Sequence, residues 1–349
     1  MRIVLKSTPS EETAHKVMRA LGVTRAFGRA LALATTLALT LAAPGRAADA
    51  IRLAVQKTGT FSWELAAIRA GGLDKEAGLS LEVTELASTE AGKIAMRAGS
   101  ADIILSDWLW VSRERALGAK LTFYPYSSAL GAVMVPASSP IKTLADLRGR
   151  KLAVAGGAID KSWLLLQARM KQDGIDLKSE ATIVYGAPPL IAAKALDGEM
   201  DASLNFWNFC AQLEAKGFRR LASVEDILPK LGAKGAVSAV GYVFDESWAA
   251  SHRDAVARFI AMTRKAKELL ATSDAAWDKV APLTGTSDPA VLKTYRDRYR
   301  EGIPRRSIDD EEKDARVLYR VLAEIGGRDL VGPAAELDPG TFYHAVPGD

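Results

Sequence analysis

Strand-like and helix-like segments alternate along the chain from about residue 50. The apolar run IRLAVQ (residues 51–56) predicts a first strand, and the next segment predicts a helix from Ser62, a plausible N-cap, to near Gly78. LSLEVTEL (79–86) alternates apolar and polar positions, which is typical of a half-buried strand. A short helix and a third strand follow over residues 90–106, so the first part of the chain reads as consecutive strand–helix–strand units.

The same alternation returns in the second third of the chain. It predicts a strand over residues 151–156, a helix over 160–174, a strand over 181–186, a helix over 187–198 and a strand over 201–206. Alternating strands and helices favour mostly parallel sheets with helices on both faces. The fold class that we expect is therefore α/β.

Two β-rich segments, around residues 121–136 and 236–244, separate these series. They suggest two lobes that are connected by two crossing strands. We expect lobe 1 to comprise residues 48–130 and 240–349, and lobe 2 to comprise residues 131–239. The chain after the second β-rich segment is almost wholly helical, and we expect this helical tail to pack back on lobe 1.

The first 47 residues have a different pattern. Arg25 and Arg29 precede an apolar run of fourteen residues (30–43), and small residues follow up to Ala47. A positive region, a short apolar region and a small-residue exit are typical of a secretory signal peptide, and the run is short for a membrane span. We expect export through the Sec route to the periplasm with cleavage near Ala47, with translation starting at Met1 or at Met18.

The positive net charge of the chain comes from this N-terminal segment. The full chain carries a formal charge of +4, but residues 1–47 hold seven Lys or Arg and only two acidic residues. The remaining residues have a formal charge of −1, so no nucleic-acid partner is expected. Hydrophobic residues make up 48% and charged residues 25%, as in a soluble globular protein.

The single cysteine, Cys210, excludes an internal disulfide framework. It lies on a predicted helix, where a free cysteine most simply serves as a small buried apolar residue.

Three stretches carry a family resemblance. They are AGKIAMRAGSADIILSDW (91–108), IKTLADLRGRKLAVAGG (141–157) and AAKALDGEMDASLNFWNFCAQLEAKGFRRL (192–221). The chain resembles, over roughly residues 50–285, the periplasmic substrate-binding proteins of nitrate/taurine/alkanesulfonate-type ABC importers. The resemblance implies a two-lobed type II periplasmic-binding fold whose lobes are joined by two hinge strands and close over one small ligand, usually an organic anion. It also implies a monomer without a required cofactor that delivers its ligand to a membrane permease and ATPase.

Tryptophans gather where such a cleft is expected, at the carboxyl ends of the predicted strands. Trp63, Trp108, Trp163 and Trp207 fall in these loops or in the first helical turns. Each could stack on a flat ligand or cap the apolar layer beneath it. The other three tryptophans, Trp110, Trp248 and Trp277, are expected to pack within or on helices.

Polar residues of the same loops complete the candidate site. The predicted N-termini of helices at Ser62 and Ser162 would aim backbone N–H groups into the cleft, and Lys57 and Lys161 would add charge. The candidate ligand-binding residues are Lys57, Thr60, Trp63, Ser106, Asp107, Trp108, Ser128, Lys161, Ser162, Trp163, Tyr185, Asn205 and Trp207. This set suits a flat, anionic aromatic ligand such as pyrroloquinoline quinone, itself a quinone cofactor; an aliphatic sulfonate, taurine or nitrate is the alternative.

Enzymatic chemistry has little support in the sequence. After the signal segment only His252 and His344 remain, and no metal-ligand spacing, nucleophile elbow or phosphate loop appears. We predict no catalytic and no metal-binding residues. A thiamine-pyrimidine or menaquinone-pathway enzyme on the same fold is the further alternative.

Overall fold

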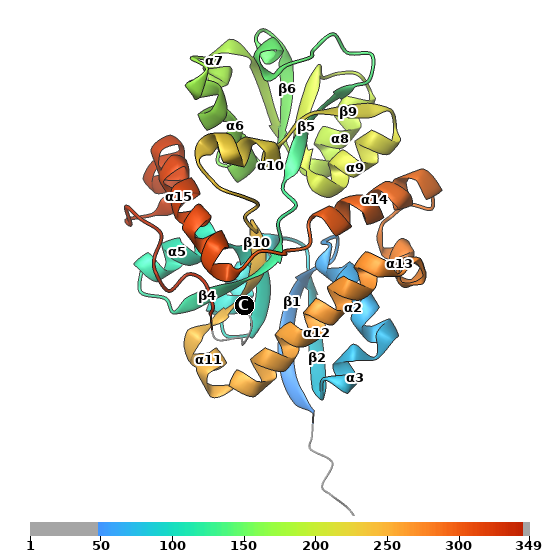
Figure 1. Ribbon diagram of the computed structural model, residues 1–349, viewed down its shortest axis with the longest axis vertical. Helices are drawn as coiled ribbons and strands as arrows, with labels where there is room; N and C mark the ends of the chain where they lie inside the picture. The colour runs from blue at the N-terminus through green and yellow to red at the C-terminus, as the bar shows by residue number, and fades with distance from the viewer. Residues whose placement is uncertain (1–47, 345–349) are drawn as a thin grey trace, which may run out of the picture. The chain divides into compact units, whose positions relative to one another are not determined.

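Two five-stranded sheets form the framework of the computed structural model (Figure 1), which describes residues 48–344. The signal-peptide prediction therefore lies outside the described residues. No helix in the described part of the chain is long and apolar enough to cross a membrane.

The first sheet has the strand order β2-β1-β3-β10-β4. Strand β1 pairs in parallel with β2 and β3, whereas β10 runs antiparallel to both β3 and β4. The strands are β1 (Asp49–Gln56), β2 (Leu79–Leu86), β3 (Ile103–Asp107), β4 (Leu121–Ser127) and β10 (Val240–Asp245). We call the half of the protein built on this sheet lobe 1.

The second sheet repeats this topology, with the order β7-β6-β8-β5-β9. Strand β6 pairs in parallel with β7 and β8, and β5 runs antiparallel to β8 and β9. The strands are β5 (Gly131–Pro136), β6 (Lys151–Ala155), β7 (Thr182–Gly186), β8 (Ala202–Phe206) and β9 (Phe218–Ser223). The half built on this sheet is lobe 2, and the two mixed, mostly parallel sheets confirm the predicted two-lobed α/β class.

A helix follows the carboxyl end of each parallel strand. In lobe 1 these helices are α2 (Phe61–Gly71), α4 (Thr89–Arg97) and α5 (Trp108–Ala116), and in lobe 2 they are α6 (Lys161–Gln172), α8 (Pro188–Leu196) and α9 (Trp207–Ala215). Because the carboxyl ends of parallel strands share one edge of a sheet, the helix N-termini gather at that edge. Shorter helical segments are α3 (Leu73–Glu76), η1 (Leu144–Leu147), α7 (Leu177–Glu180), α10 (Val224–Ile227), η2 (Leu228–Leu231), α11 (Glu246–Ser251) and η3 (Ala281–Leu283).

The helix expected from Ser62 to near Gly78 is two helices, α2 and α3. Gly72 separates them with a φ of 63°, in the left-handed region, and its N–H bonds back to the carbonyl of Arg69. A glycine in this conformation ends a helix because side chains disfavour it. The prediction missed the stop because the apolar spacing continues across it.

The helical tail packs on lobe 1, as expected, and also contacts lobe 2 (Figure 1). Helices α12 (Arg253–Thr272) and α13 (Asp274–Val280) pack on α2 of lobe 1. Helix α14 (Pro289–Glu301) packs on α9 of lobe 2, and α15 (Ile308–Val331) packs on both α5 and α6. Helices α14 and α15 of the tail therefore connect the two lobes.

Candidate functional site

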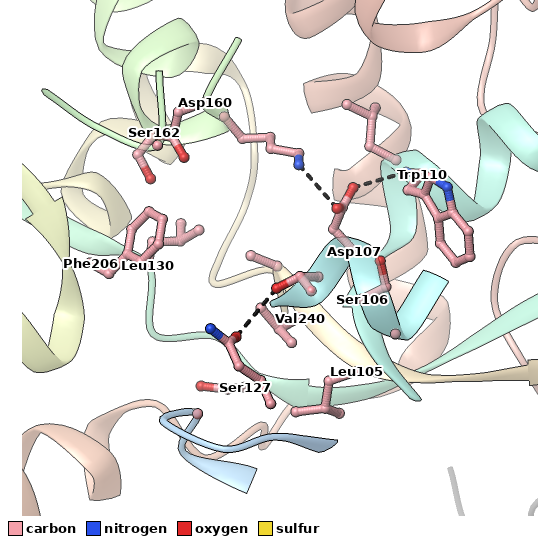
Figure 2. Close-up of a pocket in the computed structure, with 18 of the residues that line it drawn as sticks. Leu105, Ser106, Asp107, Trp110, Ser127, Leu130, Asp160, Ser162, Phe206 and Val240 are labelled. Carbon is pink, nitrogen blue, oxygen red and sulfur yellow. Dashed lines mark hydrogen bonds and ion pairs between the residues drawn. The ribbon is translucent and has the colours of Figure 1, made fainter. Parts of the chain in front are cut away.

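A cavity of about 1020 Å³ lies between the carboxyl ends of the two sheets (Figure 2). Its wall in lobe 1 includes Ser106 and Asp107 at the end of β3, and its wall in lobe 2 includes Asp160 and Phe206. Leu130, between β4 and β5, forms part of the floor. A cavity of this size can enclose most of a drug-sized ligand.

Six helices begin at this cavity. The N-cap and first residue of each line it: Thr60 and Phe61 of α2, Ser88 and Thr89 of α4, Asp107 and Trp108 of α5, Asp160 and Lys161 of α6, Ala187 and Pro188 of α8, and Phe206 and Trp207 of α9. Side chains cap α4, α5 and α6, whereas α2, α8 and α9 have no side-chain cap. Helix N-termini carry partial positive charge, so their convergence favours an anion in the cavity.

An ion pair crosses the cavity from one lobe to the other. The Lys161 Nζ donates to Asp107 Oδ2 at 3.0 Å, while Asp107 Oδ1 accepts the N–H of Trp110 at 2.8 Å (Figure 2). Burial alone would raise the pKa of Asp107, but the charges of Lys161 and Lys93 and the Trp110 amide outweigh it, so this pKa lies below its ordinary value. Asp107 is therefore ionised and paired.

A second carboxylate, Asp160, lies beside the pair. Its Oδ1 accepts the N–H of Trp163 at 3.2 Å and caps α6. Burial raises the pKa of Asp160 to about 6, against the lowering effects of the Trp163 amide and Lys161. Asp160 can therefore gain a proton within the mildly acidic range.

A cationic group that the sequence did not indicate lines the lobe 1 side of the cavity. Lys93 and Arg97 lie one turn apart on α4, with Lys93 Nζ 5.3 Å and Arg97 Cζ 5.7 Å from the ring centroid of Trp110. Lys93 pairs with Glu90 at 2.8 Å, and Arg97 pairs with Glu114 at 2.6 Å. One signal in the sequence points to Lys93 and Arg97, which is their spacing of four residues on one face of α4. Both lie a full turn or more beyond the loop that precedes the helix, where binding residues were expected.

Ser106 adds a polar group with an unused hydrogen-bonding capacity. Its side chain is 3% exposed, it lines the cavity, and its hydroxyl has no hydrogen-bond partner among residues 48–344. A buried hydroxyl without a partner is costly, and a ligand oxygen could satisfy it.

The cavity brings together seven of the thirteen predicted ligand-binding residues. Those that line it are Thr60, Ser106, Asp107, Trp108, Lys161, Ser162 and Trp207. Those that do not are Lys57, Trp63, Ser128, Trp163, Tyr185 and Asn205. Contact of the first group with a ligand stays a prediction.

Trp63 does not line the cavity, because its side chain packs in an aromatic cluster between the lobes. Its ring packs against those of Trp207, Trp277 and Tyr295, with centroids 5.9, 6.0 and 5.4 Å away. Trp207 also packs against Tyr299 of α14, at 6.4 Å. The predicted cleft tryptophan Trp63 is thus a packing residue, and Trp207 both packs and lines the cavity.

The remaining predicted residues are held elsewhere for separate reasons. Trp163 is fully buried in the main core, and Asn205 is buried with its side-chain amide donating to the carbonyl of Pro188. The Ser128 hydroxyl donates to the carbonyl of Gly302, whereas Lys57 and Tyr185 are exposed outside the cavity. Trp110 was expected only to pack within or on a helix, but it lines the cavity.

The described residues hold neither a metal-ligand cluster nor an exposed thiol. No group of three or more His, Cys, Asp or Glu side chains in residues 48–344 could hold a metal ion. Cys210 is fully buried, as predicted, and burial raises the pKa of its thiol to about 12. A thiol in that state is a poor nucleophile.

Two α/β lobes that share this mixed strand order, with a cavity at the carboxyl ends of their strands, have the type II periplasmic-binding fold. The family described as NMT1/THI5 like matches residues 67–275, more than half of the chain. The chain belongs to this family. None of the curated proteins searched matches it.

Solved structures support the fold. The periplasmic aliphatic sulphonate binding protein SsuA from Escherichia coli is 21% identical with a TM-score of 0.64, over 82% of this chain and 95% of that one. The alkanesulfonate-binding protein SsuA from Xanthomonas axonopodis pv. citri, bound to MOPS, is 19% identical with a TM-score of 0.61, over 82% and 96%. A DszB mutant in complex with biphenyl-2-sulfinic acid is 17% identical with a TM-score of 0.54, over 84% and 96%.

Proposed function

We propose that this protein is the periplasmic substrate-binding component of an ABC importer and captures a small organic anion between its lobes. The observation that carries this proposal is the convergence of six helix N-termini and two lysines, Lys93 and Lys161, on one cavity. Partial charges of helix termini and full charges of ammonium groups both stabilise an anion. A permease and an ATPase of the inner membrane would receive the ligand.

The ligand that fits best is flat and aromatic. Phe206 is partly exposed at the wall, and Trp108, Trp110 and Trp207, which are 5%, 7% and 8% exposed, also line the cavity. An aromatic wall favours a planar ligand. The cavity of about 1020 Å³ is far larger than nitrate or taurine requires. Pyrroloquinoline quinone, a flat tricarboxylate, is the sharpest candidate of this class.

An aliphatic sulfonate is the second candidate. Two similar solved structures are described as sulfonate-binding proteins, one of them bound to MOPS. The DszB mutant holds an aromatic sulfinic acid on the same fold, so the fold itself accommodates both ligand classes. The aromatic wall favours the first candidate for this chain.

Calorimetric titration of the purified mature protein tests the proposal. The ligands are pyrroloquinoline quinone, benzenesulfonate, MOPS, taurine and nitrate. We expect saturable binding of one organic anion per chain, with the aromatic anions tightest, and recovery of the ligand unchanged. Conversion of the ligand would favour the enzyme alternative, and preference for taurine or nitrate over the aromatic anions would reject the flat-ligand proposal.

A further inference from the structure

Asp107 occupies the place where an anion would be expected to bind. It pairs with Lys161 of lobe 2, 3.0 Å away, and the charge of Lys93 of lobe 1 also lowers the pKa of Asp107. All three side chains line the cavity. The protein thus places a carboxylate of its own beside cationic side chains from both lobes.

The two partners of this ion pair are held unequally. The Asp107 carboxylate is fixed at the start of α5, because its other oxygen accepts the Trp110 N–H at 2.8 Å, and its side chain is 18% exposed. The Lys161 side chain is 37% exposed and reaches across from α6. Lys161 is therefore the partner that can turn toward a ligand while Asp107 stays in place.

Two other cations of the cavity, Arg97 and Lys93, have partners that are exposed to different extents. Arg97 is bound by Glu114, whose side chain is only 11% exposed, in a two-point contact at 2.6 and 3.1 Å. Lys93 is 12% exposed, but its partner Glu90 is 75% exposed. Because Glu90 is largely exposed to solvent, its ion pair with Lys93 contributes little, and Lys93 can exchange Glu90 for a ligand at small cost.

We propose that Asp107 is an internal counter-ion, which holds Lys161 while the cavity is empty and which an anionic group of the ligand replaces beside Lys161 and Lys93. This inference rests on the proposed function. Replacement moves the Lys161 ammonium from one anion to another, so no charge is left unpaired at Lys161. The unpartnered Ser106 hydroxyl, next to Asp107 in the chain, can then donate to the incoming anion.

Such a counter-ion makes the site selective. A small inorganic anion gains only the exchange of the Asp107 carboxylate for itself beside Lys161, and it also meets the repulsion of Asp107. A large aromatic anion adds contact with the tryptophan wall and overcomes that cost. Asp107 thus lowers the affinity for every anion, and ligands with further contacts bind in spite of it.

A double-mutant cycle tests the proposal, with Asp107→Asn, Lys161→Ala and the double variant. Asparagine can still accept the Trp110 N–H, because Asn and Asp cap helices about equally well. The probes are pyrroloquinoline quinone, benzenesulfonate and MOPS, measured by calorimetry near neutral pH. Asp278→Asn, an exposed carboxylate of α13 outside the cavity lining, removes the same charge as a control.

We expect Asp107→Asn to tighten the binding of these anions by about tenfold, chiefly because Asp107 no longer competes with the ligand for the Lys161 ammonium. Lys161→Ala should weaken binding by a similar factor, and Asp107→Asn should have less than about a threefold effect in that background. Asp278→Asn should leave the affinities unchanged. Weaker binding by Asp107→Asn, or an equal gain with and without Lys161, would overturn the counter-ion proposal while leaving anion capture intact.

Absence of binding of every probe by the folded wild-type protein and the folded Asp107→Asn variant would instead overturn the proposed function, and this inference with it. Circular dichroism and thermal melts of all five proteins establish folding.

Discussion

The indole of Trp63 meets the indole of Trp207 edge to face, with ring centroids 5.9 Å apart and an interplanar angle of 86°. Trp63 belongs to α2 of lobe 1 and Trp207 to α9 of lobe 2, so this contact joins the lobes directly. Tyr299 of α14 packs on Trp207 at 6.4 Å and extends the contact into the helical tail. Any change in the angle between the lobes must therefore repack this cluster.

Truncation at this contact should destabilise the protein strongly. Trp63 is 4% exposed, so Trp63→Ala should lower the free energy of unfolding by about 3–5 kcal/mol. Urea denaturation followed by circular dichroism measures the change. Trp248→Ala, at a partly exposed tryptophan of α11 stacked on His252, is the matched control and should cost about 1 kcal/mol. Equal losses in the two variants would contradict a special role for the contact between the lobes.

Lys93 should matter for the ligand rather than for the fold. Lys93→Met keeps an aliphatic chain over Trp110 and removes the charge, so it should weaken binding of organic anions by about fivefold to tenfold. Stability should change by less than about 1 kcal/mol, because the partner Glu90 is 75% exposed. Calorimetry and thermal melts measure the two effects. Lys265→Met removes an exposed lysine paired with Glu76 outside the cavity and should affect neither; a similar loss of affinity there would point to a general charge effect.

The position of Asp160 predicts a pH dependence of both stability and binding. Its pKa in the folded protein, about 6, is raised above the ordinary value of 3.8, so the folded state holds the proton more tightly than the unfolded state. The favourable contribution is complete below the unfolded pKa and is lost as pH rises through about 6. Protonation also removes a negative charge from the cavity, so anions should bind more tightly as pH falls across this range.

Asp160→Asn isolates this effect. Above about pH 7 the variant should be more stable than the wild type by up to about 2–3 kcal/mol, and the difference should shrink toward about pH 4. The rise in anion affinity on acidification should be largely lost. Chemical denaturation and calorimetry across the range measure both, and an unchanged pH profile in the variant would show that another group titrates.

A buried ion pair beneath the cavity should be sensitive to removal of one partner. Lys267 Nζ bonds to Glu64 and, at 2.9 Å, to the hydroxyl of Tyr242, and it lies 4.2 Å from the ring centroid of Tyr126, which lines the cavity. Burial lowers the pKa of Lys267 despite the opposing charge of Glu64. Lys267→Met should cost about 3–5 kcal/mol, because it leaves the Glu64 carboxylate buried and unpaired.

The double variant Glu64→Gln/Lys267→Met should recover part of this loss, because the uncompensated charge is then gone. Urea denaturation of the two single variants and the double variant measures the coupling. Additive losses would show that the two groups act independently.

Most strands, and the carboxyl edge of each sheet at which the cavity lies, could be predicted from the sequence because both follow from local patterns. Asp107 and Lys161 could be placed because Asp107 ends a predicted strand and caps the next helix, and Lys161 begins a helix after a strand and its glycine turn. The strand β9 was missed because its sequence, FRRLAS, is short and carries two arginines, and it is recognisable only through its pairing with β5.

The directions of the tryptophans could not be predicted. Trp108 and Trp207 are the first residues of their helices and line the cavity, whereas Trp63 and Trp163 are the third residues of theirs and turn away from it. Two positions rotate a side chain by roughly 200° around the helix, so a small error in the helix start reverses the prediction. Trp110 is also a third residue, but it lines the cavity because the cavity extends along α5 toward Lys93 and Arg97.

The most direct measurement is calorimetric titration of the mature wild-type protein and its Lys161→Ala variant with pyrroloquinoline quinone, benzenesulfonate, MOPS and taurine. Capture of an organic anion between the lobes predicts one site per chain in the wild type and about tenfold weaker binding in the variant. The account also predicts that the bound compound is recovered unchanged. Binding that is equally strong without the Lys161 ammonium, or no binding of any of these anions by the folded wild type, would contradict the account.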